Sequence, residues 1–269
     1  MTQFDKIAMT IAGSDSGGGA GIQADLRTFA FHCVHGTSAI TCVTAQNTVG
    51  VDRVVPIAPE AVVAQIEAVA EDISIGATKT GMLFDREIIL AVARSIQKLN
   101  LKPLVVDPVM VSRAGATLLD DRAITSLQKD LIPLATIVTP NLYEAQILSN
   151  LSIKNLEDMQ AAAKKIYQQG AAAVLIKGGA MLDDLRGVDV FFDGGDFTVL
   201  CTETVDTVHT HGTGCSLSAA IAANLSLGKD LLRSVEAAKN YVTTALKYSL
   251  NIGRGTGPIG HFFPLLEKD

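Results

Sequence analysis

The segment 211–215, His-Gly-Thr-Gly-Cys, joins a nucleophilic side chain to a glycine-rich turn, and the small residues of 216–225 after it are typical of a helix. At a helix start the backbone N–H groups of Thr213, Gly214 and Cys215 lack helical acceptors, and the helix dipole favours negative charge. The segment therefore predicts an anion hole suited to a transferring phosphoryl group. A thiol at such a position has a lowered pKa and can act as base or nucleophile. The alternative is a buried cysteine in a capping turn.

A second group of polar residues could hold a metal ion and phosphates. Asn141 and Glu144 stand one helical turn apart, so both side chains face the same side of a predicted helix. Such a pair could bind hydrated Mg²⁺, with Glu144 as the ligand through water. Lys177 ends a predicted strand before two glycines, which favours an ammonium that faces phosphate. The alternatives are a helix cap with a solvated Glu144 and a surface Lys177 with a buried stem.

The glycine-rich loop 13–21 follows the first predicted strand and opens a helix, so its backbone could approach a ligand closely. A tight strand-to-helix turn without a ligand is the alternative. The loop is not a Walker A motif, because no Lys-Ser or Lys-Thr follows it. Residues 19–24 fit a dinucleotide fingerprint only loosely, and the acidic residue expected roughly 20 positions later is missing. We therefore disfavour a nicotinamide-dependent oxidoreductase.

These residues need a scaffold, and the hydrophobic pattern predicts one. Apolar segments rich in Val and Ile, bounded by Gly, Pro or Asp, predict buried strands. Apolar stripes at helical spacing run from Ile22 to Cys33 and from Val62 to Ile73. Strands that alternate with helices indicate an α/β fold with a mainly parallel sheet covered on both faces. The predicted strands are Lys6–Ala12, Ser38–Thr44, Pro103–Asp107, Ala135–Thr139 and Ala172–Lys177, with an antiparallel edge hairpin at Gly187–Asp193 and Phe197–Cys201.

The composition limits the protein class. The 269 residues, 48% of them hydrophobic, show no linker or repeat, and we expect one domain over residues 1–269. The net charge of −6 without a basic run argues against nucleic-acid binding, and no apolar run is long enough to cross a membrane. The N-terminus lacks signal-peptide features, and the four cysteines form no CxxC pair, so we expect a cytoplasmic protein. The scattered cysteines also argue against a zinc site at His32, His35, His209 and His211.

Seven segments taken together closely resemble the bacterial hydroxymethylpyrimidine/phosphomethylpyrimidine kinases of the ribokinase-like superfamily. The resemblance runs from about Ile7 to Phe262, and it is specific because the segments share order and spacing. It implies a three-layer α/β/α sandwich that acts as a homodimer and needs ATP and Mg²⁺. The segments are 11–25, 44–48, 79–82, 106–110, 139–141, 177–179 and 211–215.

The resemblance also implies residue roles. Gln46 would read the edge of the pyrimidine, since an amide both donates and accepts. Cys215 would be the catalytic thiol where sugar kinases of the superfamily carry Asp. The family often has Pro where Ser16 stands, a change expected to alter loop stiffness and not chemistry. The remaining assignments are Gly13, Ala20, Asp25, Met82 and Val109 for the substrate, Asp107, Asn141, Glu144, Lys177 and Gly214 for ATP and magnesium, and Gly212, Thr213, Gly214 and Lys177 for the transferring phosphoryl group.

The function that the resemblance implies is ATP-dependent phosphorylation of 4-amino-5-hydroxymethyl-2-methylpyrimidine, first to the monophosphate and then to the pyrophosphate used in thiamine biosynthesis. A pyridoxal or pyridoxine kinase on the same frame is the nearest alternative, because some relatives with Gly-Thr-Gly-Cys accept both heterocycles. A domain that binds the pyrimidine without turnover is a third hypothesis. Cys215, Lys177 and Glu144 in one chain argue against it, because a sensor has no use for a phosphoryl hole.

Overall fold

The computed structural model describes residues 6–110, 119–179, 181 and 185–266. The rest of the predicted domain 1–269, including the N-terminal residues 1–5, lies outside these ranges. The strands are β1 Ile7–Asp15, β2 His35–Gln46, β3 Val51–Pro56, β4 Ala77–Thr80, β5 Leu104–Val106, β6 Ile137–Val138, β7 Val174–Ile176, β8 Asp189–Phe192 and β9 Phe197–Leu200. The helices are α1 Gly21–Phe31, α2 Pro59–Ala70, α3 Arg86–Leu99, α4 Asp121–Ser126, α5 Leu142–Ser149, α6 Leu156–Tyr167, α7 Thr213–Ser226 and α8 Leu231–Lys247.

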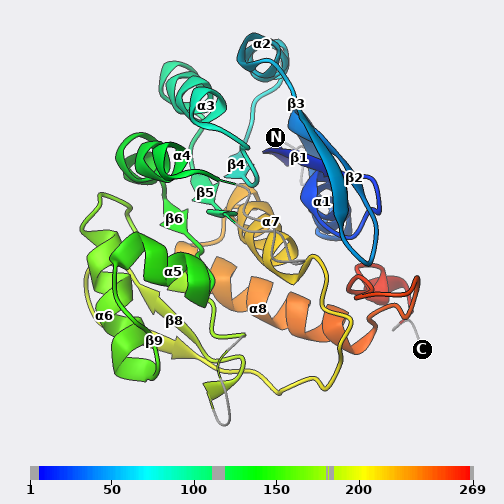
Figure 1. Ribbon diagram of the computed structural model, residues 1–269, viewed down its shortest axis with the longest axis vertical. Helices are drawn as coiled ribbons and strands as arrows, with labels where there is room; N and C mark the ends of the chain where they lie inside the picture. The colour runs from blue at the N-terminus through cyan, green and yellow to red at the C-terminus, as the bar shows by residue number, and fades with distance from the viewer. Residues whose placement is uncertain (1–5, 111–118, 180, 182–184, 267–269) are drawn as a thin grey trace.

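All nine strands form one sheet in the order β3-β2-β1-β4-β5-β6-β7-β8-β9. The pairs from β2 to β7 are parallel, while β3 at one edge and β8 with β9 at the other run antiparallel. Helices cover both faces, so the sandwich has three layers (Figure 1). The α/β fold with a mainly parallel sheet and an antiparallel edge hairpin is therefore confirmed.

The two hydrophobic cores follow the alternation of side chains along the strands. Leu104 and Val106 of β5 point into the core shared with α2 to α6, whereas Val105 points into the core shared with α1, α7 and α8. All three side chains are fully buried. Helix α7 is rich in alanine and packs against β1, β4 and β5. Its small side chains let its N-terminus lie close to the ends of the central strands.

Two strands and one helix end differ from the sequence prediction. β3 pairs with β2 as a second antiparallel edge, and its side chains are mostly exposed, so it does not show the pattern of a buried strand. β4 is a fully buried strand of polar composition, Ala-Thr-Lys-Thr, which gave no apolar signal. The stripe from Ile22 to Cys33 runs past the end of α1, because Cys33 is exposed with a positive φ of 57°. In the described part of the chain, no helix is long and apolar enough to cross a membrane.

Candidate active site

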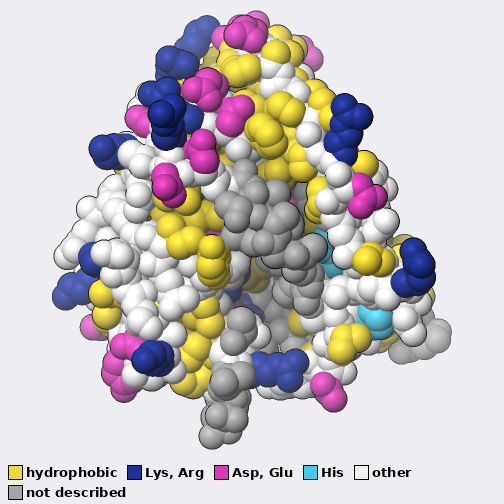
Figure 2. Space-filling view, viewed as in Figure 1, with side chains coloured by type: hydrophobic (Ala, Val, Ile, Leu, Met, Phe, Trp, Pro, Cys, Tyr) yellow, Lys and Arg dark blue, Asp and Glu magenta, His cyan; other side chains and the backbone are white. Residues whose placement is uncertain are grey.

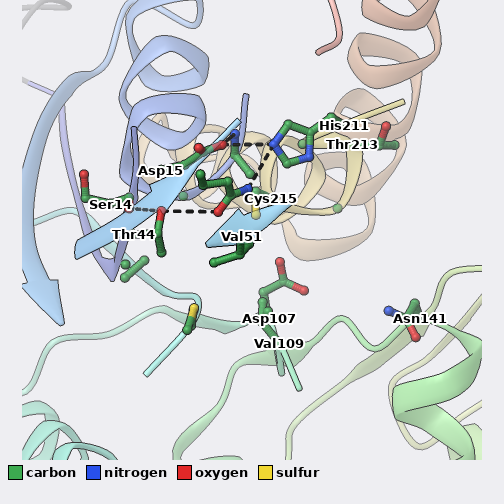
Figure 3. Close-up of a pocket in the computed structure, with 18 of the residues that line it drawn as sticks. Ser14, Asp15, Thr44, Val51, Asp107, Val109, Asn141, His211, Thr213 and Cys215 are labelled. Atoms are coloured by element: carbon green, nitrogen blue, oxygen red, sulfur yellow. Dashed lines mark hydrogen bonds and ion pairs between the residues drawn. The ribbon is translucent and has the colours of Figure 1, made fainter. Parts of the chain in front are cut away.

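A cavity of about 620 Å³ opens at the carboxyl ends of the central strands, where ligands bind in open α/β sheets. Its walls come from the loop after β1, the end of β2, the segments after β4, β5 and β7, and the starts of α5 and α7. Figure 3 shows these elements converging on one space. Of the predicted site residues, all but Asp25 line this cavity: Gly13, Ala20, Gln46, Met82, Asp107, Val109, Asn141, Glu144, Lys177, Gly212, Thr213, Gly214 and Cys215.

The glycine-rich loop is organised around the Asp15 carboxylate. Its Oδ1 accepts the N–H of Gly17 at 2.8 Å, and its Oδ2 accepts the N–H groups of Gly19 at 3.0 Å and Ala20 at 2.8 Å. Burial alone would raise the pKa of Asp15, but the bond from His211 and these N–H groups hold it below its ordinary value. The loop is therefore a turn built on an ionised carboxylate, which sequence reasoning did not identify.

Gln46 stands at one end of the cavity, and its side chain and backbone are both held. Its carboxamide lies 3.3 Å from the Thr44 hydroxyl and 3.3 Å from the His211 imidazole. The Ser16 hydroxyl accepts the Gln46 N–H at 2.8 Å and donates to the Gln46 carbonyl at 2.9 Å. Ser16 thus fixes the end of β2 through two hydrogen bonds. The sequence analysis expected Ser16 only to alter the stiffness of the glycine-rich loop.

Apolar contacts form the walls beside Gln46. Met82 and Val109 line the cavity, as predicted for a flat ring. A Cβ on Gly13 would lie 2.7 Å from the Cys42 sulfur and 3.6 Å from the Met82 sulfur, so only glycine lets the strand pass this close. One end of the cavity therefore combines apolar walls with a carboxamide that can donate and accept.

The other end gathers two carboxylates and one ammonium. Lys177 Nζ lies 2.9 Å from Asp107 Oδ1, and the Ser218 hydroxyl donates to Asp107 Oδ2 at 3.1 Å. Burial would raise the pKa of Asp107, but Lys177 and Lys79 hold it below its ordinary value. Burial is also the main reason that the pKa of Glu144 rises to about 7, with Lys177 opposing and Asp107 adding to the rise. The group carries more negative than positive charge when Glu144 ionises.

Asn141 and Glu144 begin α5 with a reciprocal cap. The Asn141 side chain accepts the Glu144 N–H at 2.9 Å, and Glu144 Oε2 accepts the Asn141 N–H at 2.8 Å. The alternative of a helix cap with a solvated Glu144 is therefore correct in its first part and wrong in its second. Asn141 and Glu144 do cap the helix, but Glu144 is only 3% exposed. The cap fixes the direction of a carboxylate that lines the cavity. Hard oxygen ligands of this kind fit Mg²⁺.

Helix α7 begins beside this group, with Gly212 as N-cap at a φ of 83°. A Cβ on Gly212 would lie 1.8 Å from the Gly19 carbonyl oxygen, so the two glycine-rich segments touch through backbone. The Thr213 N–H donates to the Thr210 carbonyl at 3.3 Å, which removes it from the predicted anion hole. A Cβ on Gly214 would lie 3.3 Å from Lys177 Nζ. The later N–H groups of the turn, with Lys177 beside them, are thus left for the predicted anion hole.

The prediction of a lowered Cys215 pKa is wrong for this structure. Burial, together with the carboxylates of Asp107 and Asp25, raises the pKa of Cys215 to about 11. Lys79 and a hydrogen bond from the Gly21 backbone lower it, but by less. Desolvation disfavours a thiolate more strongly than one helix end favours it. Cys215 is a protonated thiol at neutral pH.

Asp25, which the resemblance places near the reacting hydroxymethyl group, does not line the cavity. Its side chain is fully buried and lies 2.7 Å from Lys79 Nζ, and the Thr10 hydroxyl donates to the same oxygen at 2.6 Å. Lys79 does line the cavity. Burial would lower the pKa of Lys79, but Asp25 raises it, so Lys79 is a fixed cation. Asp25 thus contacts the lining residue Lys79, and its charge also acts on Cys215.

Sequence reasoning gave no individual role to Asp15, Thr44 or Lys79, and it used His211 only as the first residue of the segment 211–215 and as part of a rejected zinc pair. All four line the cavity. Asp15 and His211 lie 2.9 Å apart although 196 positions separate them in the chain. For Asp15, Thr44 and His211 the available signal was their place near the end of a strand or before a helix, where polar side chains meet a ligand. Lys79 lies inside β4, which gave no such signal.

A glycine-rich turn at a helix start, buried lysines and paired carboxylates, all at the carboxyl edge of an α/β sandwich, define a small-molecule kinase of the ribokinase-like kind. The family model of phosphomethylpyrimidine kinase matches residues 15–260. The chain belongs to this family, and it is a phosphotransferase.

Individual relatives agree with this assignment. The chain is 59% identical to hydroxymethylpyrimidine/phosphomethylpyrimidine kinase of Synechococcus elongatus over 96% of this chain and 98% of that protein. It is 46% identical to the protein of the same description from Bacillus subtilis, over 95% and 94% of the two chains. Among solved structures, an ADP complex of Bacillus subtilis pyridoxal kinase matches with a TM-score of 0.90 and 40% identity, over 97% of this chain and 99% of that chain.

Proposed function

We propose that this protein transfers the γ-phosphoryl group of ATP to the hydroxymethyl oxygen of 4-amino-5-hydroxymethyl-2-methylpyrimidine, and then a second phosphoryl group to the monophosphate. The observation that carries the proposal is one cavity with Gln46 and apolar walls at one end and Lys177, Gly214 and Cys215 at the other. A flat aminopyrimidine fits the first end, and phosphates fit the second. The ADP complex of the pyridoxal kinase supports nucleotide binding on this fold.

The residues of this chain can align the reaction and neutralise its charge. Phosphoryl transfer passes through a loose transition state that needs positioning more than a strong base. Lys177 and the N–H groups at the start of α7 would stabilise the moving phosphoryl group. The oxygen–phosphorus bond to ADP breaks, the bond to the hydroxymethyl oxygen forms, and the hydroxyl proton passes to the Cys215 thiolate.

The Cys215 thiol must release its own proton to solvent before it can accept the hydroxyl proton, because burial and the nearby carboxylates raise its pKa to about 11. Asp107 is one of the charges that raise this pKa, so neutralising Asp107 lowers it. Mg²⁺ would supply charge neutralisation at the phosphates, and Glu144 and Asp107 are the residues that would hold it, Glu144 through water. Filling the phosphate end would therefore remove one of the charges that oppose the thiolate, while burial, the largest cause of the raised pKa, remains.

The proposal is tested by a phosphorus NMR time course with ATP, Mg²⁺ and hydroxymethylpyrimidine. Monophosphate should appear first and pyrophosphate second. Cys215→Ala should slow the first transfer more than the second, because the nucleophile of the second step is already an anion. An unchanged first step in that variant would remove Cys215 as the base, and no turnover by the wild type would reject the proposed substrate.

A second activity on pyridoxal is favoured by the match to the pyridoxal kinase structure. The same time course with pyridoxal in place of the pyrimidine decides between the two. Pyridoxal phosphate as the only product would move the chain to the vitamin B6 kinases. Comparable turnover of both compounds would show that the enzyme phosphorylates the pyrimidine and pyridoxal alike.

The proposed assembly is a homodimer in the cytoplasm. Val43 and Val55 face each other across β2 and β3, each 44% exposed, and Val49 in the adjoining turn is 60% exposed. An apolar patch of this kind at a sheet edge supports an interface between copies. The free thiols of Cys33, Cys42, Cys201 and Cys215 support a reducing compartment. Sedimentation analysis of Val55→Glu beside the wild type tests the dimer, and a monomeric wild type would reject it.

A further inference from the structure

The contacts around Gln46 show which atom of each hydrogen bond must carry the hydrogen, and Asp15 is the first of these groups. The Asp15 pKa is below its ordinary value, and the carboxylate accepts three backbone N–H groups, so it has no proton to give. His211 Nε2 lies 2.9 Å from Asp15 Oδ2. Nε2 must therefore carry the hydrogen of this contact. A protonated ring nitrogen cannot also accept the Gln46 amide nitrogen, which lies 3.3 Å away.

The opposite side of the carboxamide presents the same mismatch. The Thr44 hydroxyl lies 2.9 Å from the Ser14 carbonyl oxygen, which can only accept, so its single hydrogen is used there. What Thr44 offers to Gln46 is a lone pair. The atom of Gln46 that lies 3.3 Å from Thr44 Oγ1 is Oε1, which is also an acceptor. With the side chain in this position, a donor faces a donor at His211 and an acceptor faces an acceptor at Thr44.

Turning the carboxamide by half a turn about its last torsion resolves both mismatches. Oε1 then accepts from His211 Nε2–H, which it shares with Asp15, and the amide nitrogen donates to Thr44 Oγ1. We propose that the Asp15–His211 pair and the Ser14–Thr44 pair are positioning residues that hold the Gln46 carboxamide with its oxygen toward His211 and its nitrogen toward Thr44. Figure 3 shows Thr44 on one side, and His211 with Cys215 on the other.

This orientation decides how a substrate lies in the cavity, and here the inference rests on the proposed function. The free lone pair of Oε1 would accept the exocyclic amine, and the second amide hydrogen would bind the adjacent ring nitrogen. The amine therefore lies on the His211 side. In 4-amino-5-hydroxymethyl-2-methylpyrimidine the hydroxymethyl group neighbours the amine on the side away from that ring nitrogen. It is thus directed toward the segment Gly212–Cys215, which directly follows His211. The opposite carboxamide orientation would turn the reacting group away from Cys215.

The first test reads the proton directly and uses no substrate. Long-range ¹H–¹⁵N spectra of histidine-labelled protein distinguish a protonated from a bare Nε2, and loss of the signal in His211→Gln assigns it. We expect Nε2 of His211 to carry a proton at neutral pH. A bare Nε2 would mean that His211 accepts from Gln46, and this result would overturn the proposal whatever the enzyme phosphorylates.

The second test uses variants matched in shape. His211→Gln keeps an N–H donor near the position of Nε2, whereas His211→Met has similar length and no donor; Thr44→Val removes the hydroxyl at nearly constant volume. We expect KM for the pyrimidine to rise about tenfold in His211→Met and Thr44→Val, with most of the loss recovered in His211→Gln. KM for ATP should stay within about twofold of the wild type, because one lost hydrogen bond at the ring affects the phosphate end little. His35→Met, at an exposed histidine, controls for loss of an imidazole.

The third test removes the amine from the substrate. The wild type should discriminate against 5-hydroxymethyl-2-methylpyrimidine by about tenfold or more, and His211→Met should discriminate much less, because its Gln46 oxygen is no longer fixed. Equal discrimination by both proteins would overturn the proposal. If the wild type phosphorylates neither pyrimidine, the proposed function fails, and the spectrum of His211 still decides the carboxamide orientation.

Discussion

The buried ion pair between Asp25 and Lys79 should stabilise the fold and also set the charge beside Cys215. Both side chains are fully buried, and their charged atoms lie 2.7 Å apart. Removing one partner of such a pair leaves an uncompensated charge in a low-dielectric interior, at a cost of about 3–5 kcal/mol. Asp25→Asn keeps the size of the side chain and removes its charge. It should therefore lower the stability by about that amount, which for a chain of this size is roughly 6–20 °C in Tm.

The ion pair between Asp25 and Lys79 leaves one carboxylate oxygen without a partner, and a double variant tests what the pair contributes. Within the described residues, Asp25 Oδ1 is buried without a hydrogen-bond partner. The desolvation of Asp25 is therefore only partly offset, and its pKa is raised by burial despite Lys79. The double variant Asp25→Asn/Lys79→Met removes both charges. Its stability should lie well above that expected from the sum of the two single losses, because neither charge remains unpaired.

Activity and stability should separate in this double variant. Lys79 lowers the pKa of Cys215, so its loss makes the thiolate harder to form even where the fold is restored. Urea unfolding followed by circular dichroism gives the stability of the four proteins, and the rate of monophosphate formation gives their activity. A cost below about 1 kcal/mol for Asp25→Asn would refute the reasoning, because Lys79 would then have to be neutral or otherwise paired. Full activity in the double variant would remove Lys79 from the control of Cys215.

Three further outcomes follow from the cavity. Because burial raises the pKa of Glu144 from 4.5 to about 7, its contribution to stability is present below pH 4.5 and lost as the pH rises through 7; Glu144→Gln should remove this loss when Tm is measured from pH 4 to 8. Iodoacetamide should alkylate Cys215 slowly at neutral pH, with a rate that rises toward pH 11, as mass spectrometry of its peptide would show; fast reaction at pH 7 would contradict the raised pKa. Ser16→Ala removes both hydrogen bonds to the Gln46 backbone and should raise KM for the pyrimidine by about three- to tenfold, whereas an unchanged KM would mean that water replaces the hydroxyl.

The sequence predicted the positions of most of the central strands, because apolar runs bounded by Gly, Pro or Asp report burial directly, and its motifs predicted many of the residues that line the cavity. The edge strand β3 escaped this reasoning, since four of its six residues, including Asp52 and Arg53, are exposed. The strand β4 escaped it for the opposite reason: Thr78, Lys79 and Thr80 are polar yet fully buried. Their burial depends on the neighbours β1 and β5, which no local pattern reveals.

Contacts between distant segments could not be predicted for a similar reason. Asp15 and His211 each stand in a motif that the sequence made visible, but their 2.9 Å contact depends on how the loop after β1 meets the start of α7. Asp25 was assigned to the substrate by resemblance alone. Its contact with Lys79, a residue that lines the cavity, could not be predicted, because it joins α1 to β4 across the sheet.

The ionisation state of Cys215 depends on distant charges, so the motif His-Gly-Thr-Gly-Cys could predict its place but not its pKa. A helix start and Lys79 favour the thiolate, while burial and the carboxylates of Asp107 and Asp25 oppose it. The opposing charges belong to the phosphate end of the cavity or to the pair beneath it. Neutralising Asp107 removes one charge that opposes the thiolate, while burial, the largest cause of the raised pKa, remains. Through this one charge, activation of the hydroxymethyl oxygen is linked to binding of the phosphoryl donor.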